Sequence, residues 1–251
     1  MRNKIVNTSN TAKFLAAMGA LQNRGAEEAC LLVVDGEPGL GKSRTIEWWA
    51  VQQDAVFVRA KQEWTPRWAV GEILESLGET PAHAFEARYR QALEALDKRA
   101  RSAELGDRTF AVVVDEADHI SRRPRILESL RDLSDMLEVP FVMVGMGRIR
   151  HNLKRFPQVM SRVSQLVEFK PASREDVAAL VAGLCETDVK EDLVAFLHRA
   201  SEGYVREIKE GIKAIERFAV RNPGAIGCAE MGGQVLMNDR RTGRPIMVPR
   251  A

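Results

Sequence analysis

Residues 30–43 read Cys30-Leu31-Leu32-Val33-Val34-Asp35-Gly36-Glu37-Pro38-Gly39-Leu40-Gly41-Lys42-Ser43. The last eight residues match the phosphate-loop pattern G-x-x-x-x-G-K-[ST], and an apolar run stands directly before them. This motif needs a strand in front and a helix behind, because backbone N–H groups and the helix N-terminus must converge on phosphate oxygens. The stretch therefore predicts a β-strand, a nucleotide-binding loop and a helix, in that order.

The loop assigns roles to individual side chains. We expect Lys42 to contact the β- and γ-phosphate oxygens and the Ser43 hydroxyl to ligate Mg²⁺. The strand before the loop, the periodic helix after it and a second motif downstream argue against a chance match. The residues predicted to bind the nucleotide are Gly36, Glu37, Pro38, Gly39, Leu40, Gly41, Lys42, Ser43 and Arg44.

The second motif is an apolar run that ends in two carboxylates, Phe110-Ala-Val-Val-Val-Asp115-Glu116. A buried parallel strand of this kind delivers its last acid to the metal, so Asp115 is the second predicted Mg²⁺ ligand. Glu116 points elsewhere and is the candidate general base that polarises a water molecule. Neither an Asn-Lys-x-Asp motif nor an Asp-x-x-Gly switch is present, which favours ATP over GTP.

The composition is that of an ordinary globular protein, with 45% hydrophobic and 29% charged residues in 251. No apolar stretch approaches the roughly 18 residues of a membrane span, and the N-terminus does not read as a signal peptide. The three cysteines lack C-x-x-C spacing, so the sequence suggests neither a disulfide framework nor a zinc site. We expect a cytoplasmic protein of a bacterium or a phage-infected host, with no membrane partner.

The net charge is only +2, but the basic residues are clustered along the sequence. No acid occurs between Glu138 and Glu168, a stretch that contains Arg148, Arg150, Lys154, Arg155 and Arg162. Two other basic runs contain Arg122, Arg123 and Arg125, and Arg240, Arg241, Arg244 and Arg250. Such runs are typical of a solvated face, a nucleotide-sensing set or a nucleic-acid footprint, and we favour the last. Trp64 and Trp68, which could flank a nucleic acid, are more typical of a packed helix edge.

Apolar periodicity predicts alternating helices and strands up to about residue 170, hence an α/β fold with a parallel sheet covered on both faces. The expected strands are 30–35, 55–59, 110–115, 139–145 and 165–169. The expected helices include one near 10–21, one following Ser43, and others at 66–78, 83–105 and 124–138. This region, 1–170, is the predicted ATP-binding core.

The pattern changes at Pro171. Three helical patterns, about 173–184, 189–201 and 204–221, predict a small helical lid over residues 171–224. Residues 225–251 are glycine-rich, polar and basic, and show no sustained period. We therefore expect a basic C-terminal tail that is flexible alone or ordered by a partner.

A phosphate loop, an Asp-Glu pair after the third strand and a trailing three-helix lid resemble an AAA+ ATPase over residues 10–221. The resemblance implies a five-stranded sheet of order 5-1-4-3-2. The compact core, the Val-Gly end of the fourth strand and the basic tail are similar to ATPases that select targets for DNA transposition, of the phage Mu B, TnsC and IstB type. This implies an ATPase that forms a filament or ring on duplex DNA without reading its sequence and stimulates a transposase.

The resemblance also implies roles for two arginines. Arg162, just before the fifth strand, matches the arginine finger that reaches a neighbouring subunit's γ-phosphate, with Arg148 and Arg155 as competitors. Arg206 matches the sensor 2 arginine of the lid. Met146 stands where sensor 1 is usually polar, which implies slow hydrolysis. The alternative is a protein-interaction ATPase of the secretion or signalling type, whose basic patches are merely solvated.

Overall fold

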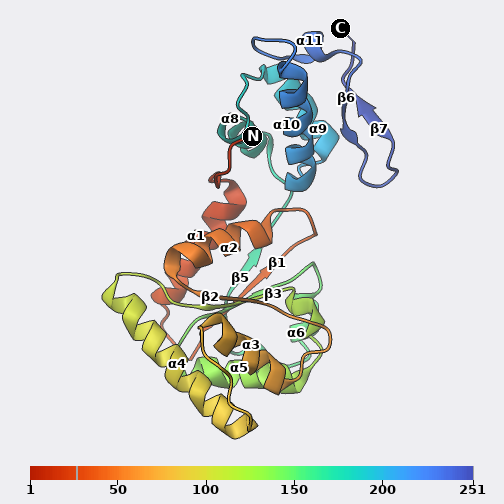
Figure 1. Ribbon diagram of the computed structural model, residues 1–251. Coiled ribbons are helices and arrows are strands. Elements are labelled where there is room, and N and C mark those ends of the chain that lie inside the picture. The colour runs from red at the N-terminus through yellow and green to blue at the C-terminus, as the bar shows by residue number, and fades with distance from the viewer. Residues whose placement is uncertain (27, 251) are drawn as a thin grey trace. The chain divides into compact units, whose positions relative to one another are not determined.

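The structure, a computed structural model, describes residues 1–26 and 28–250 (Figure 1). The chain divides into two compact units. The α/β unit comprises residues 14–37 and 42–168, and the helical unit comprises residues 1–13, 38–41 and those from 169 onward. Each unit has its own hydrophobic core.

In the described part of the chain, the α/β unit contains a parallel sheet of five strands in the order β2-β3-β4-β1-β5. This is the predicted order read from the opposite edge, so the predicted fold class is confirmed. The strands are β1 (Leu31–Asp35), β2 (Val56–Arg59), β3 (Val112–Asp115), β4 (Phe141–Val144) and β5 (Val163–Glu168).

The central strands are apolar because both of their faces are covered. Every residue of β3 and β4 is buried, and so are the first four residues of β1. Phe141 lies in register with Leu31 on one side and Val112 on the other. Strands buried on both faces read as continuous runs of β-branched residues, which is why the pattern identified them. The edge strands β2 and β5 are partly exposed.

Helices surround this sheet in the α/β unit, and α1 begins in residues assigned to the helical unit (Figure 1). No described helix is long and apolar enough to span a membrane. The elements are α1 (Ser9–Gln22), α2 (Lys42–Gln53), α3 (Pro66–Ser76), α4 (Phe85–Leu105), the 3-10 helix η1 (Ala117–His119), α5 (Pro124–Leu137), α6 (Ile149–Leu153) and α7 (Pro157–Met160).

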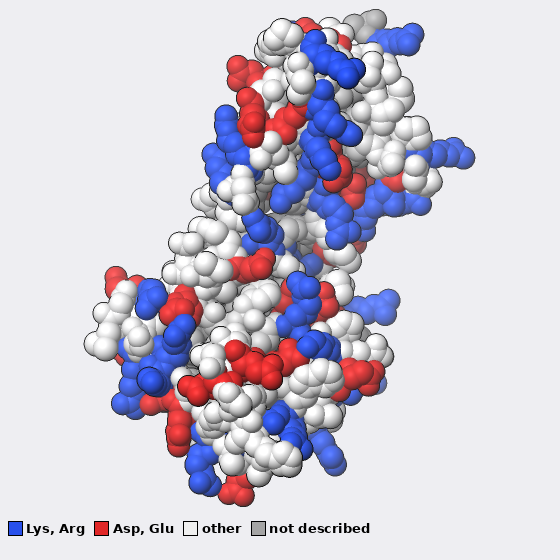
Figure 2. Space-filling model, viewed as in Figure 1, with Lys and Arg blue, Asp and Glu red and all other residues white. Residues whose placement is uncertain are grey.

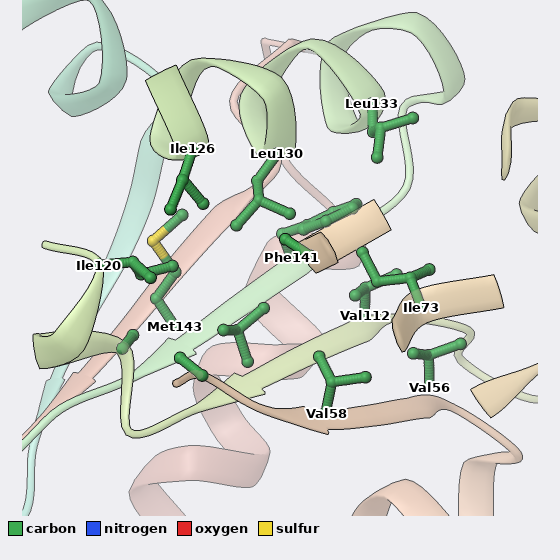
Figure 3. Close-up of a cluster of buried hydrophobic side chains, with 14 of the residues drawn as sticks. Val56, Val58, Ile73, Val112, Ile120, Ile126, Leu130, Leu133, Phe141 and Met143 are labelled. Atoms are coloured by element: carbon green, nitrogen blue, oxygen red, sulfur yellow. The ribbon is translucent and has the colours of Figure 1, made fainter. Parts of the chain in front are cut away.

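One face of the sheet packs against α3 and α5 (Figure 3). The helix α5 contributes Ile126, Leu130 and Leu133, which recur every three or four residues and so lie on one face. These side chains meet Phe141 and Met143 of β4 in the buried cluster. The apolar spacing in the sequence is therefore the spacing of the core contacts.

Trp64, before α3, and Trp68, in the first turn of α3, have different environments. Trp64 is fully buried in the core, so the packing interpretation is right for this residue. Trp68 is 42% exposed, and the Lys61 ammonium lies 5.1 Å from its ring centroid. Thr65 begins the helix by accepting a hydrogen bond from the Trp68 N–H at 3.2 Å.

The helical unit contains the three helices predicted for the lid. Ser173 and Asp176 form a capping box at the start of α8. The apolar faces of the three helices share one core, which includes Val177, Leu197 and Ile212. The helices are α8 (Arg174–Leu184), α9 (Glu191–Ser201) and α10 (Val205–Ala219).

The expected flexible tail is wrong for residues 226–250. This segment forms a short helix, α11 (Cys228–Met231), and an antiparallel hairpin of β6 (Val235–Asn238) and β7 (Pro245–Met247). Leu236 and Val248 are each 1% exposed and belong to the core of the helical unit. A hairpin this short holds too few apolar residues to show a period, and its stability comes from packing against helices distant in sequence.

The first residues of the chain also belong to the helical unit. Asp176 accepts hydrogen bonds from the Ser9 backbone N–H at 2.7 Å and from its hydroxyl at 2.5 Å. Asn10 exchanges two hydrogen bonds with the backbone of Lys170. The capping carboxylate of α8 therefore also fixes the beginning of α1.

Because Leu236 is buried beneath the hairpin, we predict that Leu236→Ala destabilises the protein by about 2–4 kcal/mol. Chemical denaturation followed by circular dichroism measures this change. The matched control is Val235→Ala, since Val235 is 46% exposed in the same strand. Equal stability of the two variants would contradict the packed position of the hairpin.

Candidate nucleotide-binding site

The phosphate loop begins where β1 ends and is anchored at that point. The Asp35 carboxylate accepts hydrogen bonds from the backbone N–H groups of Gly36 at 2.9 Å and Gly147 at 2.5 Å. The start of the loop is thus tied to the segment after β4. Farther along the loop, Gly39 and Gly41 have φ values of 92° and 89°, a region that side-chain-bearing residues rarely adopt.

Lys42 begins α2 and is a buried cation, with 6% of its surface exposed. Its ammonium donates to the carbonyl oxygens of Gly36 at 2.6 Å and Glu37 at 2.8 Å. Burial lowers the pKa of Lys42, and the nearby carboxylates of Asp35 and Asp115 oppose that effect. A phosphate oxygen would supply the negative charge that neutral carbonyl groups cannot give this ammonium.

Asp115, the last residue of β3, has the environment expected of a metal ligand. It is 3% exposed, and its Oδ1 accepts a hydrogen bond from the Glu116 N–H at 2.9 Å. Its buried Oδ2 has no hydrogen-bond partner in the described residues, and the nearest cation is the Arg59 guanidinium at 3.9 Å. An unpaired buried carboxylate oxygen is unfavourable unless a cation or donor satisfies it. The orphaned Oδ2 therefore fits a divalent ion.

The described residues contain no group of three or more His, Cys, Asp or Glu that could enclose a metal ion. Mg²⁺ does not require such a cage, because it commonly takes one or two protein ligands and completes its shell with phosphates and water. Asp115 and the hydroxyl of Ser43, in the first turn of α2, are the residues that would hold it. The buried ammonium of Lys42 and the orphaned oxygen of Asp115, both in the α/β unit, fit a nucleotide bound with Mg²⁺.

Glu116 leaves the strand in the left-handed conformation, with φ of 54°. A non-glycine residue in this region is strained by about 1–2 kcal/mol. Its carboxylate lies 3.7 Å from Arg59 Nε and 3.5 Å from His119 Nε2. Arg59 thus lies near the carboxylates of both Asp115 and Glu116, and Arg59 and His119 are two basic neighbours that were not identified from the sequence.

The sequence analysis also missed Asp118. Its carboxylate accepts a hydrogen bond from the Met146 N–H, and its buried Oδ1 has no partner among the described residues. A Cβ on Gly145 would lie 2.9 Å from Asp118 Oδ2, so the glycine makes room for this carboxylate. Burial raises the pKa of Asp118. The Asp118 carboxylate therefore reaches the end of β4, although it comes from the 3-10 helix after β3. In the sequence, the Asp-Glu-Ala-Asp pattern at 115–118 is the signal that could have identified it.

The tip of the phosphate loop, residues 38–41, contacts the start of α10 within the helical unit. The Arg206 N–H donates to the Gly39 carbonyl at 3.1 Å. A Cβ on Gly39 would lie 3.6 Å from the Tyr204 ring, and one on Gly41 would lie 3.6 Å from Val205. The structure therefore brings the backbone of Arg206, the predicted sensor 2 residue, to the loop tip. Its side-chain role stays a prediction.

The remaining predicted site residues are placed as follows. The Arg162 side chain donates to Asp135 of α5, with 2.9 Å between Nε and Oδ2, and it is 32% exposed. Leu40 is buried at 3% exposure. Glu37, Pro38 and Arg44 are exposed.

Comparison with known proteins identifies the family. A family described as the AAA domain matches residues 25–153, which is half of the chain. The chain belongs to the AAA domain family. The AAA fold implies nucleotide binding, which agrees with the loop, the lysine and the carboxylate described above. No curated protein matches the sequence.

Solved structures share the fold at low sequence identity. The Aeropyrum pernix ORC1 protein, solved in complex with DNA, is 17% identical, with a TM-score of 0.59 over 86% of this chain and 61% of that one. Cdc6p from Pyrobaculum aerophilum is 18% identical, with a TM-score of 0.62 over 92% and 68%. The RuvB Holliday junction branch migration motor of Thermotoga maritima is 16% identical, with a TM-score of 0.55 over 87% and 65%. The chain thus spans roughly two thirds of these proteins.

We predict that Lys42→Ala weakens nucleotide binding by about a hundredfold or more, because it removes a buried charge that no neighbouring side chain replaces. Titration with a fluorescent ATP analogue measures the affinity. The control is Lys98→Ala, the same change at an exposed position of α4. Parental affinity in Lys42→Ala would contradict the assignment, and thermal unfolding shows whether the variant is folded.

Proposed function

We propose that this protein is a slow ATPase that, with ATP bound, assembles on duplex DNA without sequence preference and selects targets for a transposase. The ATPase part is supported by the AAA family match and by the geometry of the phosphate loop. The DNA part is supported by a basic surface described below. The transposase part is supported by the resemblance to target-selection ATPases in the arrangement of core, lid and basic C-terminal segment.

The chain's own residues divide the work of hydrolysis. Lys42 holds the phosphates, and Asp115 with Ser43 holds the metal, which when bound supplies positive charge to the phosphate oxygens. Glu116 accepts a proton from the attacking water at a carboxylate oxygen. In the structure this carboxylate lies 3.7 Å from Arg59 Nε and 3.5 Å from His119 Nε2, and these contacts restrain it. That restraint supports slow turnover.

One observation carries the DNA part of the proposal. Four exposed cations, Arg148, Arg150, Lys154 and Arg155, lie in or beside α6, and no described acid pairs with any of them. The segment between Glu138 and Glu168 contains no acid, so this stretch of sequence adds no carboxylate of its own to the surface. We call these four residues the α6 basic surface. Such a surface suits the phosphate backbone, which is contacted without reading bases.

Four arginines of the other basic runs are engaged within the chain. Arg122 donates to the Asn152 side chain and Arg123 to the Trp64 carbonyl. Arg240 stacks on Tyr204, and Arg241 pairs with Glu202. Figure 2 shows Lys and Arg mixed with Asp and Glu over much of the visible face of the α/β unit. The α6 basic surface therefore differs from these four arginines, because no described acid pairs with its cations.

The proposed arginine finger needs a second subunit. Within its own chain Arg162 is held by Asp135, so it must leave that carboxylate to reach a neighbour's nucleotide. Asp135 Oδ1 is buried without a hydrogen-bond partner among the described residues. A neighbouring phosphate would compete with Asp135 for the guanidinium, and assembly would thereby be linked to nucleotide binding.

We predict that a mixture of Arg162→Ala and Glu116→Gln recovers ATPase activity that neither variant shows alone. At some interfaces of the mixture, an intact finger from one subunit meets an intact base from the other. Phosphate release at fixed total protein measures the recovery. The control mixes Arg162→Ala with the double variant Arg162→Ala/Glu116→Gln, so that no subunit carries the finger. If the first mixture is no more active than this control, a role for Arg162 in trans is contradicted.

We predict nucleotide-dependent, salt-sensitive binding to a random duplex. The expected affinity falls by orders of magnitude between about 50 and 200 mM salt, because each phosphate contact releases counterions. Binding should require ATP or a non-hydrolysable analogue, since single subunits bind weakly and linked subunits bind by avidity. Fluorescence anisotropy of a labelled duplex measures it.

The decisive variant is Arg150→Glu/Lys154→Glu, which reverses two charges of the α6 basic surface and spares the competing finger residues. Its control is Arg90→Glu/Lys98→Glu, the same charge change on exposed positions of α4. Loss of duplex binding in the first variant alone supports the proposal. Equal binding by both variants contradicts the role of α6, and absence of ATP-dependent binding by the parent favours the protein-interaction ATPase.

A further inference from the structure

The turn of the C-terminal hairpin is built as a rigid element. The Asp239 carboxylate accepts hydrogen bonds from the N–H groups of Arg241 at 2.9 Å and Thr242 at 2.6 Å, and from the Thr242 hydroxyl at 2.8 Å. Two backbone hydrogen bonds, from Asp239 to Arg244 and from Gly243 to Asp239, close the turn. The strands that carry it are anchored in the core of the helical unit by Leu236. The turn thus has a fixed conformation.

Two arginines of this turn contact the segment that leads into α10. The Arg240 guanidinium lies 3.7 Å from the centroid of the Tyr204 ring, a close cation–π stack. Arg241 pairs with Glu202 at 3.2 Å. Glu202 and Gly203 both have positive φ, and a Cβ on Gly203 would lie 2.6 Å from the Ala172 carbonyl, so this bend is closely packed.

Tyr204 joins the hairpin to the phosphate loop. The residue is 8% exposed, with Arg240 stacked over its ring and the Gly39 backbone beside the ring edge. Two residues later, the Arg206 N–H holds the Gly39 carbonyl. All of these contacts lie within the helical unit. The path from hairpin to loop tip therefore consists of two side chains and one backbone hydrogen bond.

We propose that Arg240 and Tyr204 are positioning residues for the nucleotide, through which the C-terminal hairpin holds the start of α10 against the phosphate-loop tip. The loop backbone must present its N–H groups in one conformation to bind phosphates, and Gly39 and Gly41 alone do not enforce it because glycine is conformationally permissive. The hairpin restricts the conformations of Gly39 and Gly41, although it lies outside every recognised nucleotide-binding motif. This inference rests on the nucleotide-binding part of the proposed function.

The arginines of the turn have a second conceivable use, direct contact with duplex DNA. The stacking of Arg240 and the ion pair of Arg241 argue against it, because both guanidinium groups would have to give up internal partners. Arg244, by contrast, is exposed on the same hairpin, and the hydrogen bonds it makes with described residues involve its backbone, with its N–H donating to Thr242 Oγ1 and its carbonyl accepting from the Asp239 N–H. It therefore provides a control of identical chemistry that lacks the stack.

The test measures the affinity of a fluorescent ADP analogue, which reports binding without turnover and without DNA. We expect Arg240→Ala to weaken binding about fivefold, the effect of a partly buried cation–π contact. Arg240→Lys, which keeps a cation over the ring, restores part of the affinity, and Arg244→Ala leaves it unchanged. Tyr204→Ala weakens binding, and adding Arg240→Ala to it has no further effect, because the two residues act through one contact.

Parental affinity in Arg240→Ala overturns the inference, as does an equal loss in Arg244→Ala. Failure of the parent to bind nucleotide would overturn the proposed function itself. A merely structural role predicts that affinity falls only where the variant has begun to unfold, so thermal unfolding is measured for each variant. Positioning predicts weaker ADP binding at a temperature at which Arg240→Ala is still fully folded. Loss of duplex binding with unchanged ADP affinity would identify Arg240 as a DNA contact and contradict positioning.

Discussion

The candidate nucleotide site is organised around one buried cation. Lys42 carries its charge at the first turn of α2 with almost no access to water, and the charges that oppose its desolvation come from Asp35, Asp115 and Asp118. Asp35 is the last residue of β1, Asp115 is the last residue of β3, and Asp118 follows β3 in the 3-10 helix. Parallel strands deliver their carboxyl ends to one edge, so the strand order β3-β4-β1 is what gathers these charges. The order of the strands thus does two things: it buries the apolar strands, and it places the carboxylates that stabilise the Lys42 charge.

The fold was predictable because its signals are local. The valine-rich runs of β1, β3 and β4 report burial on both faces, and the phosphate-loop pattern orders strand, loop and helix. The hairpin of β6 and β7 was not predictable in this way. Its few apolar residues, Leu236 and Val248 among them, are buried by helices that begin tens of residues earlier in the chain, so the local sequence does not show that they belong to a core. A composition rich in glycine and arginine resembles a flexible tail until those partners are known.

The site was predictable where a motif fixes a role and unpredictable where contacts are distant in sequence. Lys42 and Asp115 stand in the environments that their motifs indicated. Asp118 and Arg59 were not identified, because Asp118 acts at the end of β4 across 28 positions and Arg59 meets Glu116 only through the pairing of β2 with β3. Met146 is an example: its own side chain is apolar, but the Asp118 carboxylate of the 3-10 helix η1 supplies a polar group at the same end of β4.

Clusters of arginine that look alike in sequence have different physical meanings in the folded chain. Where the side chain has an internal partner, as Arg162 has in Asp135 and Arg240 has in Tyr204, an external ligand must compete for it, and binding is thereby linked to rearrangement. Where it has none, as in the α6 basic surface, binding an anion requires no such exchange. In the function that we propose, the same residue type supplies a DNA-binding surface at α6 and, at Arg162, a contact that must open. Nucleotide-dependent assembly of that kind needs both, because DNA binding alone cannot distinguish one nucleotide state from another.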